Sequence, residues 1–253
     1  KINDLNFVDH SGFMLDKFRS DFSLCNHYLN FNKLRILAHG TSIKMNHLKM
    51  SFESWSNFSD FVNKIRLDAD ITNSYIKTST LAYIVPSFKN IQLSATLNGQ
   101  IKGPVSDIRG KNLEITMGAQ TKILTNINIT GLPRIDQTLM VVDIKELSTT
   151  RNDLLSIKNQ DNRSILNIPS DIDVLGKTTY KGNFTGYINN FVAYGTINSA
   201  IGKLAIDLSF IPDKEQGVAF EGNVNAVNLD VGKLAQSEVI GKTTFHAKVK
   251  GSS

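Results

Sequence analysis

The chain has 253 residues, of which 41% are hydrophobic, and its 28 lysines and arginines outnumber its 23 acidic residues by five. This hydrophobic fraction is ordinary for a globular protein and argues against a disordered chain. The basic residues are scattered singly over polar strand positions. The basic stripe and aromatic platforms that nucleic acid needs are missing, so we expect no nucleic-acid partner.

Short strands are predicted from Ile2 to Phe52, because hydrophobic residues alternate with polar ones over runs of strand length. Between residues 54 and 64 the hydrophobic residues instead recur three and four positions apart, which is typical of a short helix. This segment holds the single tryptophan, Trp55, which we expect to plug one end of a core.

A strand from Ile65 to Ile71 follows, in which Asp68 and Asp70 share the face opposite to the hydrophobic residues. A second short helix is expected from Ser79 to Val85, since Ser79 or Thr80 can cap its start and Pro86 follows its end.

Strands predominate again from Ile91 to Asp143, and the last of them shows alternation through Leu139 and Val141. A helix of one or two turns is expected within residues 150–156. A polar loop then leads into a short predicted strand, Ile165 to Ile168.

The stretch from Lys177 to Phe210 carries the clearest pattern. Three strand-length segments are joined by turns at Asn189-Asn190 and Ile201-Gly202, whose residue types suit tight hairpins. Hydrophobic residues and glycines take alternate positions in each segment. The pattern predicts an antiparallel meander with one apolar face and one polar face.

The rest of the chain continues in the same manner. A strand is expected from Val218 to Val224 and a last strand from Thr243 to Lys250. Between them, residues 228–236 can form a short helix with Asp230 near its start.

A short pattern recurs within the chain. The segment Gly176–Gly186 resembles Gly241–Gly251, 65 residues later, and Ala95–Gly103 is a fainter copy. Each copy has an apolar residue at every second position and a small residue in mid-strand. Units that cannot bury their own hydrophobic face must stack on their neighbours. Glycines in mid-strand favour a sheet that curls.

Chemistry-bearing motifs are missing from the sequence. None of the five histidines has a second histidine or cysteine at metal-ligand spacing, and neither a phosphate-binding loop nor a nucleophile elbow occurs. Asp68 and Asp70 are expected to point to solvent. We therefore expect a protein that is not an enzyme and that uses no cofactor and no metal.

The single cysteine, Cys25, cannot form an internal disulfide. The longest hydrophobic run, Leu81–Val85, is far shorter than the roughly 20 residues of a membrane helix. Because the chain begins without methionine and ends within a strand pattern, we expect it to be a segment of a longer protein.

The sequence therefore predicts an all-β fold, in which a curved antiparallel sheet with a few short helices forms a taco-like apolar groove. Residues 1–253 are expected to form one elongated segment, with a candidate sub-boundary near residues 150–165. The residues expected to line the groove are apolar and recur at alternate strand positions. They are Ile91, Leu93, Leu97, Leu113, Ile115, Met117, Phe184, Ile188, Phe191, Ile197, Leu204, Ile206, Leu208, Phe220, Val224, Phe245 and Val249.

Two readings of this apolar face follow from the residues alone. A second layer that covers it would make it an ordinary core. If it is instead an open trough, it offers a continuous strip to acyl chains. At about 0.8 kcal/mol per methylene, a chain of about 16 carbons could gain on the order of 10 kcal/mol gross.

Several segments, taken together and in this order, resemble one family. They are Phe13–Leu24, Leu29–Ile36, Met50–Phe61, Gly99–Leu113, Gly186–Thr196 and Leu229–Leu234. They are similar to TamB, the translocation and assembly module subunit, in the form found in Bacteroides-like bacteria and within the wider AsmA-like group.

The resemblance implies a periplasmic protein that an N-terminal helix anchors in the inner membrane, with a long β-sheet rolled around an apolar lining. It implies a role in outer-membrane biogenesis, through transport of phospholipid acyl chains between the membranes. Alternatively, it implies help to outer-membrane protein assembly with a barrel partner of the Omp85 type. The family has no catalytic residues to carry over.

Two rivals to a lipid conduit remain open. A scaffold could guide nascent outer-membrane strands by pairing with a sheet edge. An enzyme built on a β-helix, such as a polysaccharide-cleaving one, would require carboxylates clustered on one surface.

Overall fold

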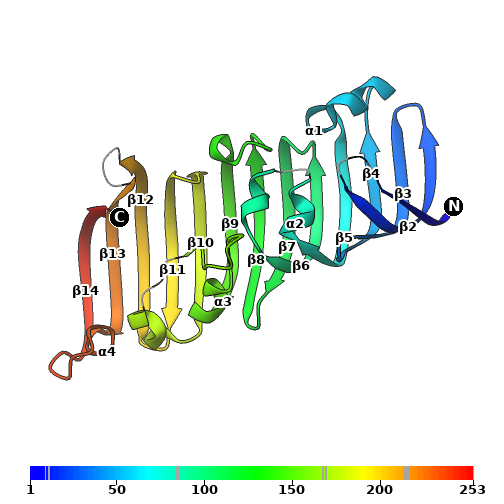
Figure 1. The fold of residues 1–253 in the computed structure, drawn as a ribbon. Coiled ribbons are helices and arrows are strands. Elements are labelled where there is room, and N and C mark those ends of the chain that lie inside the picture. The colour runs from blue at the N-terminus through cyan, green and yellow to red at the C-terminus, as the bar shows by residue number, and fades with distance from the viewer. Residues whose placement is uncertain are drawn as a thin grey trace.

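The computed structural model describes residues 1–8, 10, 12–83, 86–166, 168, 170–213 and 217–252. It confirms the all-β prediction: 14 antiparallel strands form one curved, unclosed sheet with a few short helices (Figure 1). The strands are β1 Ile2–Val8, β2 Met14–Cys25, β3 Tyr28–Ala38, β4 Thr41–Ser51, β5 Arg66–Lys77, β6 Ser94–Gly103, β7 Asp107–Met117, β8 Thr121–Thr130, β9 Leu139–Thr149, β10 Thr178–Tyr187, β11 Asn190–Ser199, β12 Gly202–Asp213, β13 Gly217–Asp230 and β14 Lys242–Ser252.

Strand order in the sheet is the order in the sequence, from β1 to β14. Each strand therefore pairs only with the strands before and after it in the chain. The meander expected from Lys177 to Phe210 forms as β10, β11 and β12, which pair without a register shift. Its turns fall one residue earlier than predicted: Ile188 and Asn189 join β10 to β11, and Ala200 and Ile201 join β11 to β12, so Asn190 and Gly202 already begin strands.

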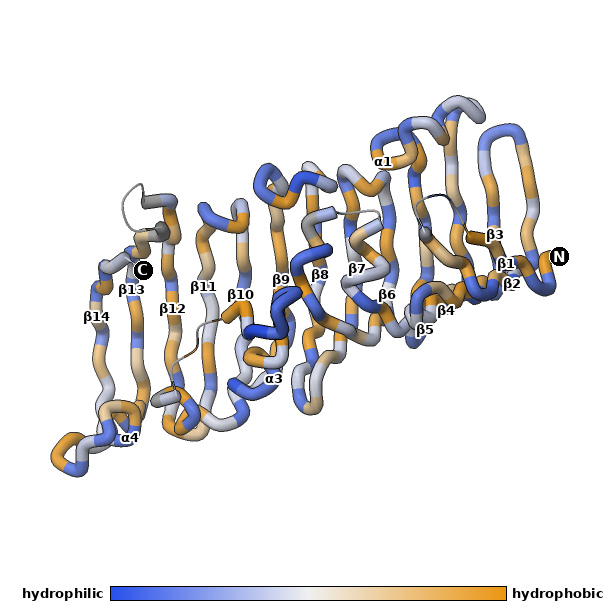
Figure 2. The backbone as a smooth tube through the Cα atoms, viewed as in Figure 1, coloured by the Kyte–Doolittle hydropathy of each residue, from blue (hydrophilic) through white to orange (hydrophobic). Residues whose placement is uncertain are grey.

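The pairing gives every strand a row of mostly hydrophobic residues on the same side of the sheet. Leu204 of β12 lies opposite Ile197 of β11 and Ala226 of β13, and Ile197 lies opposite Tyr180 of β10. Paired residues share a face, and side chains alternate along a strand. Figure 2 shows the resulting alternation of hydrophobic and hydrophilic residues along the strands.

We call this side of the sheet the apolar face. It consists of the residues that lie opposite one another on neighbouring strands, beginning with Leu5 and Phe7 in β1 and ending with Phe245 and Val249 in β14. The opposite side, the polar face, carries most of the charged residues of the strands.

Where the alternation of hydrophobic and polar residues breaks, a β-bulge returns the next hydrophobic residue to the apolar face. In β7, Asn112 has a positive φ of 49°, and its backbone N–H donates to Oδ1 of Asn126 on β8 at 2.8 Å. The extra residue lets both Gly110 and Leu113 face the apolar side. Asn73 of β5 does the same with Oδ1 of Asn98, at 2.6 Å.

The helices lie in connections between strands, and they recur every four strands. At one end of the strands, α2 (Thr78–Leu81) and η2 (Pro86–Asn90) join β5 to β6. At the same end, α3 (Arg151–Leu155) and η4 (Ser170–Leu175) join β9 to β10, and α4 (Val231–Ala235) joins β13 to β14. At the other end, η1 (Trp55–Asp60) and α1 (Phe61–Lys64) join β4 to β5, and η3 (Ile135–Gln137) joins β8 to β9.

The predicted helices are found close to their expected bounds. Residues 54–64 form η1 and α1, residues 150–156 form α3, and α4 begins after Asp230, whose side chain accepts a bond from the N–H of Lys233. The helix expected from Ser79 begins at Thr78, while residues 84 and 85 lie outside the described residues.

The strand predicted from Ile165 to Ile168 is wrong within the described residues. Ser164 makes an isolated bridge with Lys158, and Ile165 and Leu166 are in a bend. Ser164 Oγ donates to the carbonyl of Leu166, so a local side-chain hydrogen bond occupies a carbonyl that a strand would use for pairing with a neighbouring strand. Asn167 lies outside the described residues.

The recurring sequence pattern falls on equivalent strands. Its three copies are β6, β10 and β14, each of which directly follows one of the helical connections. The copies put the same residue sizes on the apolar face, in the order large, small, large, glycine. These are Leu97, Gly99, Ile101 and Gly103 in β6; Tyr180, Gly182, Phe184 and Gly186 in β10; and Phe245, Ala247, Val249 and Gly251 in β14.

Two clusters hold most of the fully buried hydrophobic residues. The first, Leu34, Leu48, Ala69 and Ile71, lies on the apolar face of β3, β4 and β5. The second, Ile201, Ala226 and Leu229, lies at the helical end of β11 to β13. Trp55 is half exposed at the end of the sheet, where its ring packs on Phe52 and Phe58.

Candidate functional site: the apolar face

The strand pairings place the predicted lining residues on the apolar face, except Ile91, Leu93 and Ile188. Ile188 lies in the β10–β11 turn and is 56% exposed. Ile91 and Leu93 precede β6, where their carbonyls accept hydrogen bonds from Oγ1 of Thr78.

Most of the lining residues on this face have side chains that are partly exposed to solvent. Leu113 is buried and Phe245 is 37% exposed, while the others are half-buried. Within the described ranges, every strand belongs to this one sheet, so no second sheet packs on the apolar face.

Four phenylalanines form a ladder across β10 to β13 on this face. The ring centroids of Phe184 and Phe191 lie 4.6 Å apart, those of Phe191 and Phe210 lie 4.4 Å apart, and those of Phe210 and Phe220 lie 6.1 Å apart. Such ring pairs add to the stability that burial provides. The ladder gives this part of the face a continuous aromatic surface.

Beside the ladder, a tyrosine lies over two glycines. A Cβ at Gly182 would lie 2.6 Å from Oη of Tyr180, and a Cβ at Gly195 would lie 2.7 Å from Cε2 of the same ring. The hydroxyl of Tyr180 donates to the carbonyl of Tyr194 at 3.0 Å. Burial raises the pKa of the Tyr180 hydroxyl, and Tyr194 adds to the rise. The ring therefore covers backbone that the glycines would leave bare.

The most exposed part of the apolar face was missed in the sequence. Leu5 and Phe7 of β1 are 46% and 47% exposed, and Phe22 and Leu24 of β2 are 42% and 58% exposed. Their alternation in the sequence pointed to strands. Phe22 and Leu24 lie beyond the last β1–β2 pair, Ile2 with Ser20, so no strand lies beside them on that side in the described structure.

In β9 the hydrophobic residues that were singled out in the sequence do not lie on the apolar face. Leu139 and Val141 lie on the polar face and are 38% and 40% exposed. Met140, Val142 and Ile144 take the apolar face instead. Because this strand has hydrophobic residues at consecutive positions, alternation alone could not choose between the two phases.

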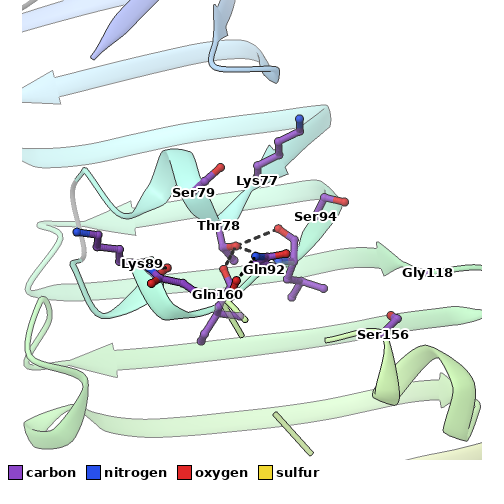
Figure 3. Close-up of a pocket in the computed structure, with 11 residues that line it drawn as sticks. Lys77, Thr78, Ser79, Lys89, Gln92, Ser94, Gly118, Ser156 and Gln160 are labelled. Carbon is purple, nitrogen blue, oxygen red and sulfur yellow. Dashed lines mark hydrogen bonds between the residues drawn. The ribbon is translucent and has the colours of Figure 1, made fainter. Parts of the chain in front are cut away.

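A hollow of about 580 Å³ lies beside the helical end of β5 and β6 (Figure 3). Thr78 occupies its centre, and the amide of Gln92 donates to the carbonyl of Gln160 at 3.4 Å. In Figure 3, Lys77 and Lys89 extend away from Thr78 in different directions. The polar groups thus tie the connection to the sheet and do not converge on one point.

On the polar face, Asp68 forms ion pairs with Lys102 at 3.1 Å and His47 at 3.4 Å. Burial alone would raise the pKa of the Asp68 carboxyl, but Lys102 and His47 outweigh it and lower that pKa. The expectation that Asp68 and Asp70 face away from the hydrophobic residues is confirmed. Among the described residues, no group of three or more metal-ligating side chains comes together.

No family model, curated protein sequence or solved structure matches this chain. Of the helices in the described part of the chain, none has the length and hydrophobicity to cross a membrane.

Proposed function

We propose that this chain is a non-enzymatic segment of a TamB-like protein and that its apolar face shields phospholipid acyl chains during transport to the outer membrane. The observation that carries the proposal is the continuity of that face across 14 paired strands, on which no second sheet packs within the described residues. By the resemblance of its sequence segments, we place its action in the periplasm, within a parent protein anchored in the inner membrane.

The half-buried state of the lining supports a surface that hydrocarbon can cover further. An acyl chain lying on these side chains would remove apolar surface from water at about 25 cal/mol per Å². No polar contact is needed for this gain, so such a site requires no catalytic or ligating group. A surface of this kind accepts chains of different length, because the gain scales with the area covered.

The fold suits an elongated path better than a closed pocket. Because each strand adds one more row to the same face, the length of the face grows with the number of strands. The crowded cluster at Leu34, Leu48 and Ala69 is expected on the inner side of a curved sheet, where side chains converge.

A charge in the middle of the face tests the proposal. Ile206 lies between Gly195 and Val224 on neighbouring strands. We expect Ile206→Asp to abolish copurification of phospholipid, measured by mass spectrometry of extracted lipid, and to block lipid passage in a vesicle-to-vesicle transfer assay. Circular dichroism should show that the β-sheet is retained.

Ala205→Asp is the matched control, because it puts the same charge on the adjacent residue of β12, whose side chain lies on the polar face. It should leave bound lipid unchanged. If Ile206→Asp unfolds the chain, the face is a closed core and the proposal is wrong. Equal lipid binding by both variants would also contradict it.

A scaffold that guides outer-membrane strands, with an Omp85-type barrel as partner, is a second candidate. This alternative rests on the ability of a sheet edge to template another strand. A photo-crosslinker in place of Phe191 discriminates the two. Lipid adducts favour the conduit, and protein adducts favour the scaffold.

A further inference from the structure

A line of polar side chains crosses the middle of the sheet on the polar face. It takes one residue from each of the strands β9 to β13, namely Asp143, Asn183, Tyr194, Asp207 and Asn223. Each of them lies directly opposite the next one in the strand pairing. Directly opposed residues share a face of the sheet, so these five side chains stand side by side. We call this set the polar row.

Three neighbouring members of the polar row are available to a ligand. Tyr194 is 53% exposed, and Asp207 and Asn223 are exposed as well. Within the described residues, no other group forms a hydrogen bond or ion pair with the Tyr194 hydroxyl, the Asp207 carboxylate or the Asn223 amide. At the far end of the row, by contrast, Oδ2 of Asp143 accepts a hydrogen bond from Nδ2 of Asn126 at 3.4 Å.

The same three residues border a hollow of about 420 Å³ on the polar face. Thr196 and Asn225 line it as well, and they lie on either side of Ala205 in the strand pairing. Because Ala205 has a small side chain, it leaves space between these larger neighbours. Asn225 is held in place by a hydrogen bond between its Oδ1 and Nδ1 of His246. The hollow is therefore surrounded by hydroxyl, carboxylate and amide groups and by one aromatic ring.

A strip of apolar side chains runs along the other side of the polar row. Val141 and Val192 precede Asp143 and Tyr194 by two positions, so they lie on the same face, and both are exposed. Thr185 lies opposite both valines and joins them. The site thus combines hydrogen-bonding groups with an exposed apolar surface that runs in the same direction.

A polysaccharide has the same division of chemistry. The C–H groups of a pyranose ring form an apolar face that can stack on an exposed tyrosine ring. Its hydroxyls both donate and accept, and Asn223 beside Asp207 offers donors and acceptors together. Neighbouring strands lie about 4.8 Å apart, which is close to the length that one sugar unit adds to an extended polysaccharide. A linear polysaccharide that lies across the strands would therefore meet one member of the row per strand.

Two other kinds of polymer fit the polar row less well. Each strand from β9 to β13 is paired on both sides, so an extended peptide cannot bind there by strand addition. The row holds two carboxylates, Asp143 and Asp207, and no basic residue. It therefore favours a neutral polymer over a polyanion such as nucleic acid.

We propose that the polar row is a binding site for a linear, neutral polysaccharide that lies across β9 to β13. The ring of Tyr194 stacks on one sugar unit, and Asp207 and Asn223 bind the hydroxyls of the units that follow. Because this site is on the polar face, it does not depend on whether the apolar face carries lipid.

Titration with defined oligosaccharides tests the proposal. The probes are cellohexaose, chitohexaose and laminarihexaose, which are linear and neutral, and isothermal titration calorimetry measures their affinity for the whole chain. At least one of them should bind. Tyr194→Ala should weaken that binding by at least about tenfold, because the stacking ring is lost. Asn223→Ala should weaken it by about fivefold, because hydrogen bonds to the sugar are lost.

Two further variants make the result specific. Tyr75→Ala is the matched control, because Tyr75 is also a tyrosine on the polar face, is 40% exposed and lies on β5, outside the polar row. Its replacement should leave the affinity unchanged. Tyr194→Phe keeps the ring and should retain most of the affinity. Circular dichroism should show that all four variants keep the β-sheet, since the replaced side chains are exposed.

Failure of all three hexasaccharides to bind at millimolar concentration overturns the proposal. Equal weakening by Tyr194→Ala and Tyr75→Ala also overturns it. So does tighter binding of heparin than of any neutral probe, because basic residues outside the row would then be the recognising groups. Binding that falls with Tyr194→Ala and Asn223→Ala, and not with Tyr75→Ala, supports it.

Discussion

Asp153, in the first turn of α3, accepts a hydrogen bond from the backbone N–H of Gln120 at 2.7 Å, although the two residues lie 33 positions apart. The same carboxylate accepts from the N–H of Ala119 at 3.0 Å and from Oγ1 of Thr121 at 2.8 Å. It thereby fastens the connection after β9 to the turn between β7 and β8.

Replacement of this carboxylate should loosen the turn. Asp153 is buried, and Asp153→Ala leaves three donors without their acceptor. We expect a loss of about 1.5–3 kcal/mol, the range for hydrogen bonds to a charged group, because water can reach the exposed Ala119 and Gln120 and Thr121 keeps its bond to Thr149. Urea denaturation, with hydrogen exchange at Ala119 and Gln120, measures it. Asp173→Ala, which removes a carboxylate that is 60% exposed beside Arg151, should cost less than about 1 kcal/mol.

The same residue should make the fold sensitive to acid. Burial alone would raise the pKa of Asp153, but the hydrogen bonds from Ala119, Gln120 and Thr121 outweigh it and lower that pKa below its ordinary value of 3.8. The unfolded chain therefore binds a proton first as the pH falls, so stability decreases below that value. Above about pH 5 the contribution is complete.

Denaturation midpoints measured from pH 6 to pH 2 check this. Asp153→Asn should be less stable at pH 6 but should decline less steeply on acidification. Asp68→Asn is the control: the pKa of Asp68 is also lowered, but its carboxyl is 41% exposed, so most of the slope should remain. An unchanged slope for Asp153→Asn would contradict the assignment.

The phenylalanine ladder should contribute to the stability of β10 to β13. Phe191 stacks on Phe184 and Phe210, so Phe191→Ala removes both ring contacts. We expect a loss of about 1–3 kcal/mol, below the value for a fully buried ring because Phe191 is half-buried. Val192→Ala, on the polar face, should stay within about 0.5 kcal/mol. Equal effects in urea denaturation would mean that the rings do not support one another.

The glycines beneath Tyr180 should tolerate no side chain. A Cβ at Gly182 would lie 2.2 Å from the carbonyl oxygen of Tyr194, so Gly182→Val forces the strands apart. We expect a loss of more than about 2 kcal/mol and faster hydrogen exchange in β10 and β11. Gly241→Ala meets no neighbouring atom and should be nearly neutral. Retained protection in Gly182→Val would show that the backbone is not closely packed there.

The parts of the fold that the sequence predicts are those with local causes. The hairpins of β10 to β12 form within one residue of their predicted turns, and Asp230 begins α4 through its own side chain. The bulges at Asn73 and Asn112 have a non-local cause, because each depends on an asparagine from the neighbouring strand.

The candidate site shows the same division. Alternation was enough to assign Leu204, Ile206 and Leu208 to one face, and the pairing of β12 agrees. It could not place β9, where Met140, Val141 and Val142 are consecutive hydrophobic residues. Nor does any pattern within a strand tell whether another layer covers the face, since that depends on where distant parts of the chain come to rest.

In this sheet every described strand pairs only with its sequence neighbours, and contacts between distant residues, such as Asp153 with Gln120, lie in the connections. Damage at one strand therefore stays near it, and insertion or loss of a whole four-strand block changes the span of the sheet while the rest keeps its contacts. Such a chain can be lengthened or shortened by whole blocks over evolutionary time.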